Sequence, residues 1–160
     1  MKIPFRHTDD DLRAMYRGNR GNQVARRYAR FWASVFGLGL LPRRWVTLEV
    51  TGRRSGRPTR FPLGMAHVDG RSYLVSMLGE ECNWVRNVRA AQGRAVLRHR
   101  HATACRLDEV PPDERAPILK AYVNQVPGAR PHVPVDRHAD VSAFSGIAGA
   151  YPVFRVTPLA

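Results

Sequence analysis

The sequence predicts an α+β fold that is mainly β: a small barrel of about six mostly antiparallel strands with flanking helices. Short segments in which apolar and polar residues alternate recur along the chain, which is typical of half-buried strands. Most links between them are short, and Asp69-Gly70 is a strong two-residue hairpin signal. The 160 residues have the length of one domain, and a hydrophobic fraction of 44% is that of a globular protein.

The first part of the chain predicts an arm followed by a helix. Residues 1–22 are polar and form the predicted N-terminal arm, which leaves residues 23–160 as a single domain. Over residues 22–41, apolar side chains recur at helical spacing: Val24, Tyr28, Phe31 and Val35. Three arginines fall largely on the other side of this amphipathic helix: Arg26, Arg27 and Arg30. The helix either packs its apolar side on the barrel, which we favour, or contacts a membrane surface.

The barrel is expected to occupy residues 44–157. Strands are predicted at residues 45–50, 59–68 and 72–77, twice within residues 94–107, and at residues 153–156. Helices are predicted at residues 79–91, where Gly93 follows as a C-terminal glycine, and at residues 111–125 and 139–150. Residues 127–134 hold three prolines and a glycine, which predicts a loop that could act as a lid over a site.

The positive charge is large and unevenly placed. The formal net charge is +13, and residues 12–68 hold twelve arginines against one acid, Glu49, a local balance of +11. A field concentrated on one part of the surface favours an anionic partner: nucleic acid, anionic lipid or a polyanionic small molecule. No nucleic-acid recognition motif accompanies the charge, so we expect no specific nucleic-acid partner.

The cysteine content and the N-terminal sequence indicate the cellular compartment. Cys82 and Cys105 are too few for a disulfide framework or a four-ligand zinc site. His99 and His101 share a strand face with only Cys105 nearby, so we favour solvated strand histidines over metal ligands and predict no metal site. No signal-peptide pattern or run of transmembrane length is present. These features predict a cytoplasmic protein, peripheral at the membrane if the first helix contacts it.

One stretch, residues 49–63, carries the most distinctive chemistry. It predicts a strand, a tight turn built on Gly52, Ser55 and Gly56, and a second strand entered through Pro58. Four arginines crowd this turn, and no acidic residue lies between Glu49 and Asp69: Arg53, Arg54, Arg57 and Arg60. Guanidinium groups and converging backbone N–H groups favour a phosphate. The alternative is an ordinary solvated hairpin turn rich in arginine.

Other familiar chemistries leave no signature. The chain has no dinucleotide-binding glycine motif, no phosphate loop ending in Gly-Lys-Ser/Thr and no nucleophile elbow. Any catalysis is therefore expected to depend on a bound cofactor.

The motif Thr51-Gly-Arg-Arg-Ser-Gly-Arg-Pro58, followed by Pro62-Leu63 and then by Trp84 and Asn87, resembles the deazaflavin (F420)-dependent nitroreductase and quinone reductase family. The resemblance covers about residues 40–110. It implies the split β-barrel of flavin mononucleotide-binding proteins and coenzyme F420, a polyanion with a phosphodiester and an oligo-γ-glutamate tail, as the cofactor; flavin mononucleotide is the alternative.

The resemblance also implies a set of cofactor-binding residues. The phosphate end would lie at Arg53, Arg54, Ser55 and Gly56, and the tail carboxylates at Arg57 and Arg60. The deazaflavin ring would be bordered by Pro62, Leu63, Gly64, Ser76 and Met77, and the pocket would be walled by Trp84 and Asn87. Two places depart from the usual family pattern. Thr59 stands where members usually carry a basic residue, and after the third predicted strand the common Ser-Lys-Gly-Gly is replaced by Ser76-Met77-Leu78-Gly79, so the lysine is lost and the acids Glu80-Glu81 follow.

The function implied is an oxidoreductase in which reduced F420 delivers a hydride to a small hydrophobic electrophile, such as a quinone, an enone or a nitro compound. Tyr151 and His132, near the predicted lid, are the candidate proton donors. A non-catalytic module that binds flavin, F420, haem or lipid stays open, as does nucleic-acid binding by the basic face. The protein is expected to be a monomer or a homodimer.

Overall fold

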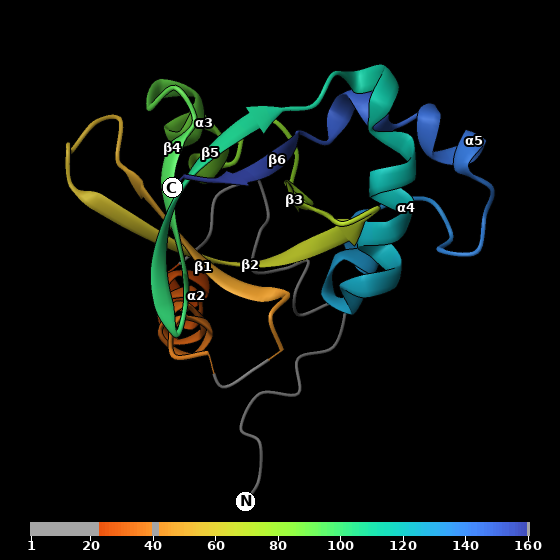
Figure 1. Cartoon of the computed structure of the whole chain (residues 1–160). Coiled ribbons are helices and arrows are strands. Elements are labelled where there is room, and N and C mark those ends of the chain that lie inside the picture. Colours follow the sequence, from red (N-terminus) through yellow and green to blue (C-terminus); the bar gives the residue numbers. More distant parts are fainter. Residues whose placement is uncertain (1–22, 40–41, 160) are drawn as a thin grey trace, which may run out of the picture.

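The computed structural model describes residues 23–39 and 42–159 (Figure 1). The predicted arm, residues 1–22, lies outside the described residues. Within them, six strands form a closed barrel in the order β1-β2-β3-β6-β5-β4, and each neighbouring pair is antiparallel. The strands are β1 (Trp45–Thr51), β2 (Pro58–Val68), β3 (Arg71–Val75), β4 (Arg94–His99), β5 (His101–Glu109) and β6 (Val153–Pro158). The predicted mainly β barrel with flanking helices is confirmed.

The barrel interior is one of two hydrophobic cores. Leu48, Leu74 and Phe154 are buried there, and the short helix α3 (Asn83–Ala90) covers this core with Trp84 and Val88. The predicted glycine stop is confirmed: Gly93 has φ 79° and donates its N–H to the carbonyl of Val88 at 2.9 Å.

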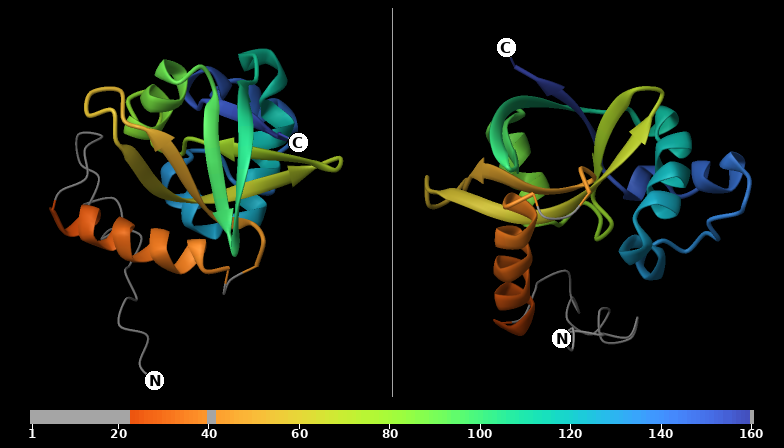
Figure 2. Two further views of the ribbon diagram at one scale, coloured as in Figure 1. Left: turned by 60° about the vertical axis from the view of Figure 1, so that its left-hand side comes forward. Right: turned by 60° about the horizontal axis from the view of Figure 1, so that its bottom comes forward.

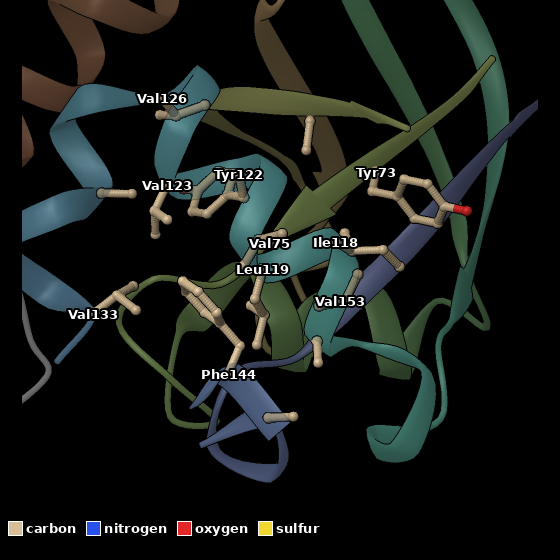
Figure 3. Close-up of a cluster of buried hydrophobic side chains, with 14 of the residues drawn as sticks. Tyr73, Val75, Ile118, Leu119, Tyr122, Val123, Val126, Val133, Phe144 and Val153 are labelled. Atoms are coloured by element: carbon tan, nitrogen blue, oxygen red, sulfur yellow. The ribbon is translucent and has the colours of Figure 1, made fainter. Parts of the chain in front are cut away.

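The second core lies outside the barrel, between its strands and helix α4 (Ala116–Gln125). Figure 3 shows Leu119, Tyr122 and Val123 of α4 beside Val75 and Val153 of the strands. Four short elements accompany α4: η2 (Pro112–Glu114), η3 (Pro127–His132), α5 (Val141–Ser145) and η4 (Ala148–Ala150). In Figure 1, α4 and α5 lie on the side of the barrel away from the turn between β1 and β2.

Two predictions for this part of the chain were wrong in detail. Residues 127–132 are not an irregular loop but a 3₁₀ turn, η3, because prolines fix φ near the helical value. The helix predicted over residues 139–150 divides into α5 and η4, separated at Gly146 and Ile147. Strand β3 also ends earlier than predicted, at Val75: the N–H of Ser76 still bonds the carbonyl of Pro152 at 2.9 Å, but Pro152 has no N–H with which to continue the ladder.

Helix α2 (Gln23–Gly37) lies against the outside of β1, β2 and β4 (Figure 2). Its contact face differs from the predicted one: Ala33 and Phe36 are buried, whereas Phe31 is 52% exposed. The barrel accepts the face that carries the small Ala33, whose carbonyl bonds the buried Thr47 hydroxyl. The side chains of Val24 and Tyr28 lie outside the described set. The helix therefore packs on the barrel, as favoured, but leaves an apolar residue on its outer face.

Candidate functional site

The arginine-rich turn between β1 and β2 has a defined geometry. The N–H of Gly52 bonds the carbonyl of Arg57 at 2.8 Å, and the N–H of Gly56 bonds the carbonyl of Gly52 at 2.9 Å. Gly56 has φ 68°, a backbone conformation that favours glycine. Gly52 is needed for space, since a Cβ there would lie 2.7 Å from the Ser55 hydroxyl oxygen. The turn is thus a compact structure held by its own backbone.

Asn87 of α3 holds one of the turn arginines in place. Its Oδ1 accepts a hydrogen bond from the Arg53 guanidinium at 2.9 Å and from the Arg53 backbone N–H at 3.2 Å. Asn87 is buried, and its Nδ2 donates to the Thr59 hydroxyl at 3.3 Å. That hydroxyl donates in turn to the carbonyl of Val50 at 2.6 Å. Thr59, one of the departures from the family pattern, therefore supports Asn87, and Asn87 orients Arg53.

The other turn arginines fall into two kinds. Arg54 and Arg57 are exposed, and neither side chain has an acidic partner within the part of the chain that the structure describes. Arg60 instead donates from Nε to the Glu49 carboxylate at 2.8 Å. The positive charge open to an anion is therefore concentrated at Arg53, Arg54 and Arg57.

Glu49 accepts hydrogen bonds from two arginines. Arg98 and Arg60 donate to it at 2.9 Å and 2.8 Å. These bonds and charges, Arg98 first, lower the pKa of Glu49 below its ordinary value of 4.5, against the opposing effect of burial.

We expect Glu49→Gln to lower the free energy of unfolding at neutral pH by about 0.5–1 kcal/mol, the range of partly exposed ion pairs. Because the pKa of Glu49 is depressed in the folded state, its stabilisation is present above pH 4.5 and is lost as the pH falls through the folded-state pKa. Urea unfolding from pH 7 to pH 3 should show wild type and variant converging at low pH. The exposed Glu114→Gln is the control, and a difference that persists at low pH would contradict the ion-pair account.

A second group of predicted residues meets where β3 ends and β6 begins. Ser76 directly follows β3, and its N–H bonds the carbonyl of Pro152, next to Tyr151. The Tyr151 hydroxyl donates to the backbone carbonyl of His132 at 2.8 Å, so the phenol contacts the main chain of the other candidate proton donor. Burial raises the pKa of Tyr151, so its phenol is protonated at neutral pH, as in an ordinary tyrosine, and is a weaker acid than an exposed one. Met77 and Tyr151 both pack against the core around α4.

The remaining predicted residues lie in the barrel wall and interior. Gly64 is buried, and a Cβ there would come within 2.9 Å of the Val126 side chain. Leu63 packs against the barrel core. Trp84 is 5% exposed, with its ring 5.6 Å from that of Phe154. In this structure Trp84 is a core residue, and its contact with a cofactor stays a prediction.

Glu80 and Glu81, the acids after β3, are paired with arginines of α3. Arg89 binds Glu80 at 2.7 Å, and Arg86 binds Glu81. The Arg89 hydrogen bond is the main cause that lowers the pKa of Glu80. The two acids are therefore locally neutralised, which reduces their repulsion of an anion bound nearby.

The structure brings the predicted residues together in two groups, and it adds one buried residue that sequence reasoning missed. The first group is the turn with Asn87, and the second is Ser76 with Tyr151 and His132. Arg115 was missed: it is 3% exposed and bonds the carbonyls of Val110, Ala148 and Tyr151. Its position before α4 looks like that of any surface arginine, so the sequence carried no signal for it. Among the described residues, no cluster of His, Cys, Asp or Glu could hold a metal ion.

Comparison with known proteins finds the same fold in several solved structures. Among solved structures, the chain is similar to an F420H2-dependent reductase (20% identity, TM-score 0.50), covering 72% of this chain and 95% of that one. It is also similar to a domain-swapped dimer (20%, TM-score 0.53; 84% and 94% covered) and to a protein of unknown function from Agrobacterium tumefaciens (16%, TM-score 0.52; 87% and 55% covered). At these identities the likeness shows the fold alone. No curated protein sequence matches the chain.

A family model decides the relationship. The model of the F420H2-dependent quinone reductases matches residues 14–142, which include the arginine turn, α3 and most of the α4 region. The chain therefore belongs to the F420H2-dependent quinone reductase family.

Proposed function

We propose that this protein binds reduced coenzyme F420 and reduces a small electrophilic organic molecule such as a quinone, an enone or a nitro compound. The observation that carries the proposal is Arg53, held by the buried Asn87 beside Arg54 and Arg57, which have no acidic partner among the described residues. Three guanidinium groups at a glycine turn fit the phosphodiester and carboxylates of such a coenzyme.

Each part of the chain has a separate task in this proposal. When bound, coenzyme F420 supplies a hydride from C5 to the electrophile. Arg53 and Arg54 bind the phosphate end, and Arg57 faces the tail. Residues 62–64, together with Ser76 and Met77, border the ring and exclude water. The reduction of a quinone also needs a proton, and the Tyr151 phenol, protonated at neutral pH, can donate one.

A titration tests the proposal. Purified protein is titrated with F420 and with flavin mononucleotide, followed by fluorescence, and then assayed for oxidation of reduced F420 with a panel of quinones, enones and nitroaromatics. We expect micromolar binding of F420 and turnover with at least one acceptor. Tight flavin binding without an F420 response would refute the cofactor assignment. F420 binding without any turnover would favour the non-catalytic module.

We infer a membrane contact for the outer face of α2 from a separate observation. Phe31 (52% exposed) and Leu38 (63% exposed) are large apolar side chains left on the surface, beside the exposed Arg27 and Arg30. Apolar side chains flanked by arginines are typical of helices that lie on anionic lipid surfaces. No helix among residues 23–39 and 42–159 is long and apolar enough to cross a membrane.

Vesicle co-sedimentation tests this contact. We expect binding to vesicles that contain phosphatidylglycerol, weakened by salt, and little binding to pure phosphatidylcholine. The double variant Phe31→Ser/Leu38→Ser should bind at least about tenfold more weakly, because it loses the apolar burial. Val141→Ser, at an exposed apolar residue of α5, is the control. Equal binding by the double variant and the wild type would show that vesicle binding depends only on non-specific charge attraction, and it would contradict the proposed apolar contact. The oligomeric state, monomer or homodimer, stays a prediction, and light scattering can measure it.

A further inference from the structure

A buried arginine joins three parts of the chain. Arg115 precedes α4 and is the one buried charged residue among those described. Its Nε donates to the carbonyl of Val110 at 2.8 Å, at the end of β5. Its Nη1 donates to the carbonyls of Ala148 (3.1 Å) and Tyr151 (3.2 Å). One rigid guanidinium therefore fastens residues 148–151 to the barrel, which a lysine, with a single charged nitrogen, could not do in the same way.

Its charge is balanced through a chain of ion pairs. Glu109 lies 3.9 Å from Arg115 and 2.7 Å from Arg89. Arg89 also binds Glu80, in the loop after β3, at 2.7 Å. Burial lowers the pKa of Arg115, and the charges of Glu109 and Glu80 act in the opposite direction. The alternating charges connect the loop that follows Ser76 with the buried guanidinium.

The segment that Arg115 holds lies between the ring-border residues and the predicted lid. On one side, the carbonyl of Pro152 accepts the N–H of Ser76 at 2.9 Å. On the other side, the Tyr151 hydroxyl donates to the carbonyl of His132, the last residue of η3. Arg130 adds a further tie, since its Nε bonds the carbonyl of Val123 in α4 at 2.9 Å. Segment η3 is thus tied to Tyr151 as well as to α4, and Tyr151 is tied to Arg115.

We propose that Arg115 is a positioning residue: its guanidinium sets residues 148–152, and through the Tyr151 hydroxyl it holds η3 over the Ser76–Met77 end of the site. The catalytic consequence rests on the proposed function, whereas the placement of η3 does not. The Arg115 and Tyr151 side chains should order different lengths of the chain. Loss of the Arg115 fork should loosen both residues 146–152 and η3, whereas loss of the Tyr151 hydroxyl should loosen η3 alone.

Hydrogen–deuterium exchange tests this order. In Arg115→Lys, which keeps the charge but loses the fork, we expect amides in residues 127–135 and 146–152 to exchange about tenfold faster, the effect of about one lost hydrogen bond. Tyr151→Phe should accelerate residues 127–135 only. Exchange in β1 and α3 should be unchanged in both variants. Arg106→Lys, at an exposed arginine of β5, is the matched control and should change neither segment.

Kinetics supply a second readout. With F420 as cofactor, Arg115→Lys should raise the KM for the acceptor and lower kcat, while the Kd for F420 stays within about twofold of wild type, because the arginine turn is untouched.

Uniform acceleration of exchange across the barrel, or no acceleration at residues 127–152, would overturn the proposal. If wild type fails to oxidise reduced F420, the proposed function falls and the exchange pattern still decides the role of Arg115. If Arg115→Lys does not fold, Glu109→Gln, which removes the counter-charge, decides it by the same pattern.

Discussion

Arg53→Gln is expected to raise the Kd for coenzyme F420 by about 10- to 150-fold, measured by fluorescence titration at fixed ionic strength. The physical reason is the loss of one charge-assisted hydrogen-bonding group, worth about 1.5–3 kcal/mol, at roughly 1.4 kcal/mol for each factor of ten. Arg53 is the turn arginine whose guanidinium is held by a buried partner, Asn87, so little side-chain entropy is lost when an anion binds.

Two companion variants separate this effect from general electrostatics. Arg71→Gln removes the same charge at an exposed position in the hairpin between β2 and β3, away from the turn, and should change the Kd less than threefold. Asn87→Ala keeps the charge of Arg53 but removes the hydrogen bond that orders the Arg53 side chain. It should weaken F420 binding by about tenfold, the effect of about one hydrogen bond. Equal losses in Arg53→Gln and Arg71→Gln would show that only net charge matters and would remove the turn from the site.

Phe144→Ala is expected to lower the free energy of unfolding by about 3–5 kcal/mol, a large part of a stability that is roughly 5–15 kcal/mol for a domain of this size. Phe144 is the aromatic side chain of α5 and is completely buried between Leu119 and Val133 of the second core (Figure 3). The truncation leaves a cavity between α4 and α5, because the surrounding helices are fixed at their ends. Urea unfolding and the melting temperature, which should fall by about 10 °C or more, measure the effect.

Val141→Ala on the same helix is the matched control. Val141 is 41% exposed, so its truncation should change the stability by less than about 0.5 kcal/mol. Similar losses in the two variants would mean that α5 is not packed as described.

The two departures from the family pattern have local roles in this chain. Thr59 replaces a basic residue, and its hydroxyl links Asn87 to β1, which favours an ordered Arg53 over one more positive charge. Glu80 and Glu81 are neutralised by arginines of α3, and Glu80 takes part in the ion-pair chain that ends at Arg115. Neither change therefore removes the positive charge of the turn.

The sequence by itself determined the barrel, the turn and the family. Strand alternation, the Asp69-Gly70 hairpin and Gly93 are local features that depend on periodicity and backbone freedom, so they can be predicted without knowing the packing. The arginines of the turn and Asn87 were predicted as one site, and the structure places Arg53 and Asn87 in direct contact.

Only the tertiary structure decided which helix face packs on the barrel and which arginines are paired or buried. Helix α2 turns Ala33 and Phe36, rather than Phe31, toward the barrel, because the contact face depends on the shape of the strands beneath it. Arg60 is paired with Glu49 because adjacent strands place them opposite each other, 11 residues apart in sequence. Arg115 is buried because three backbone carbonyls from distant segments converge on it. These choices arise from contacts between residues far apart in the chain, which hydrophobic periodicity does not encode.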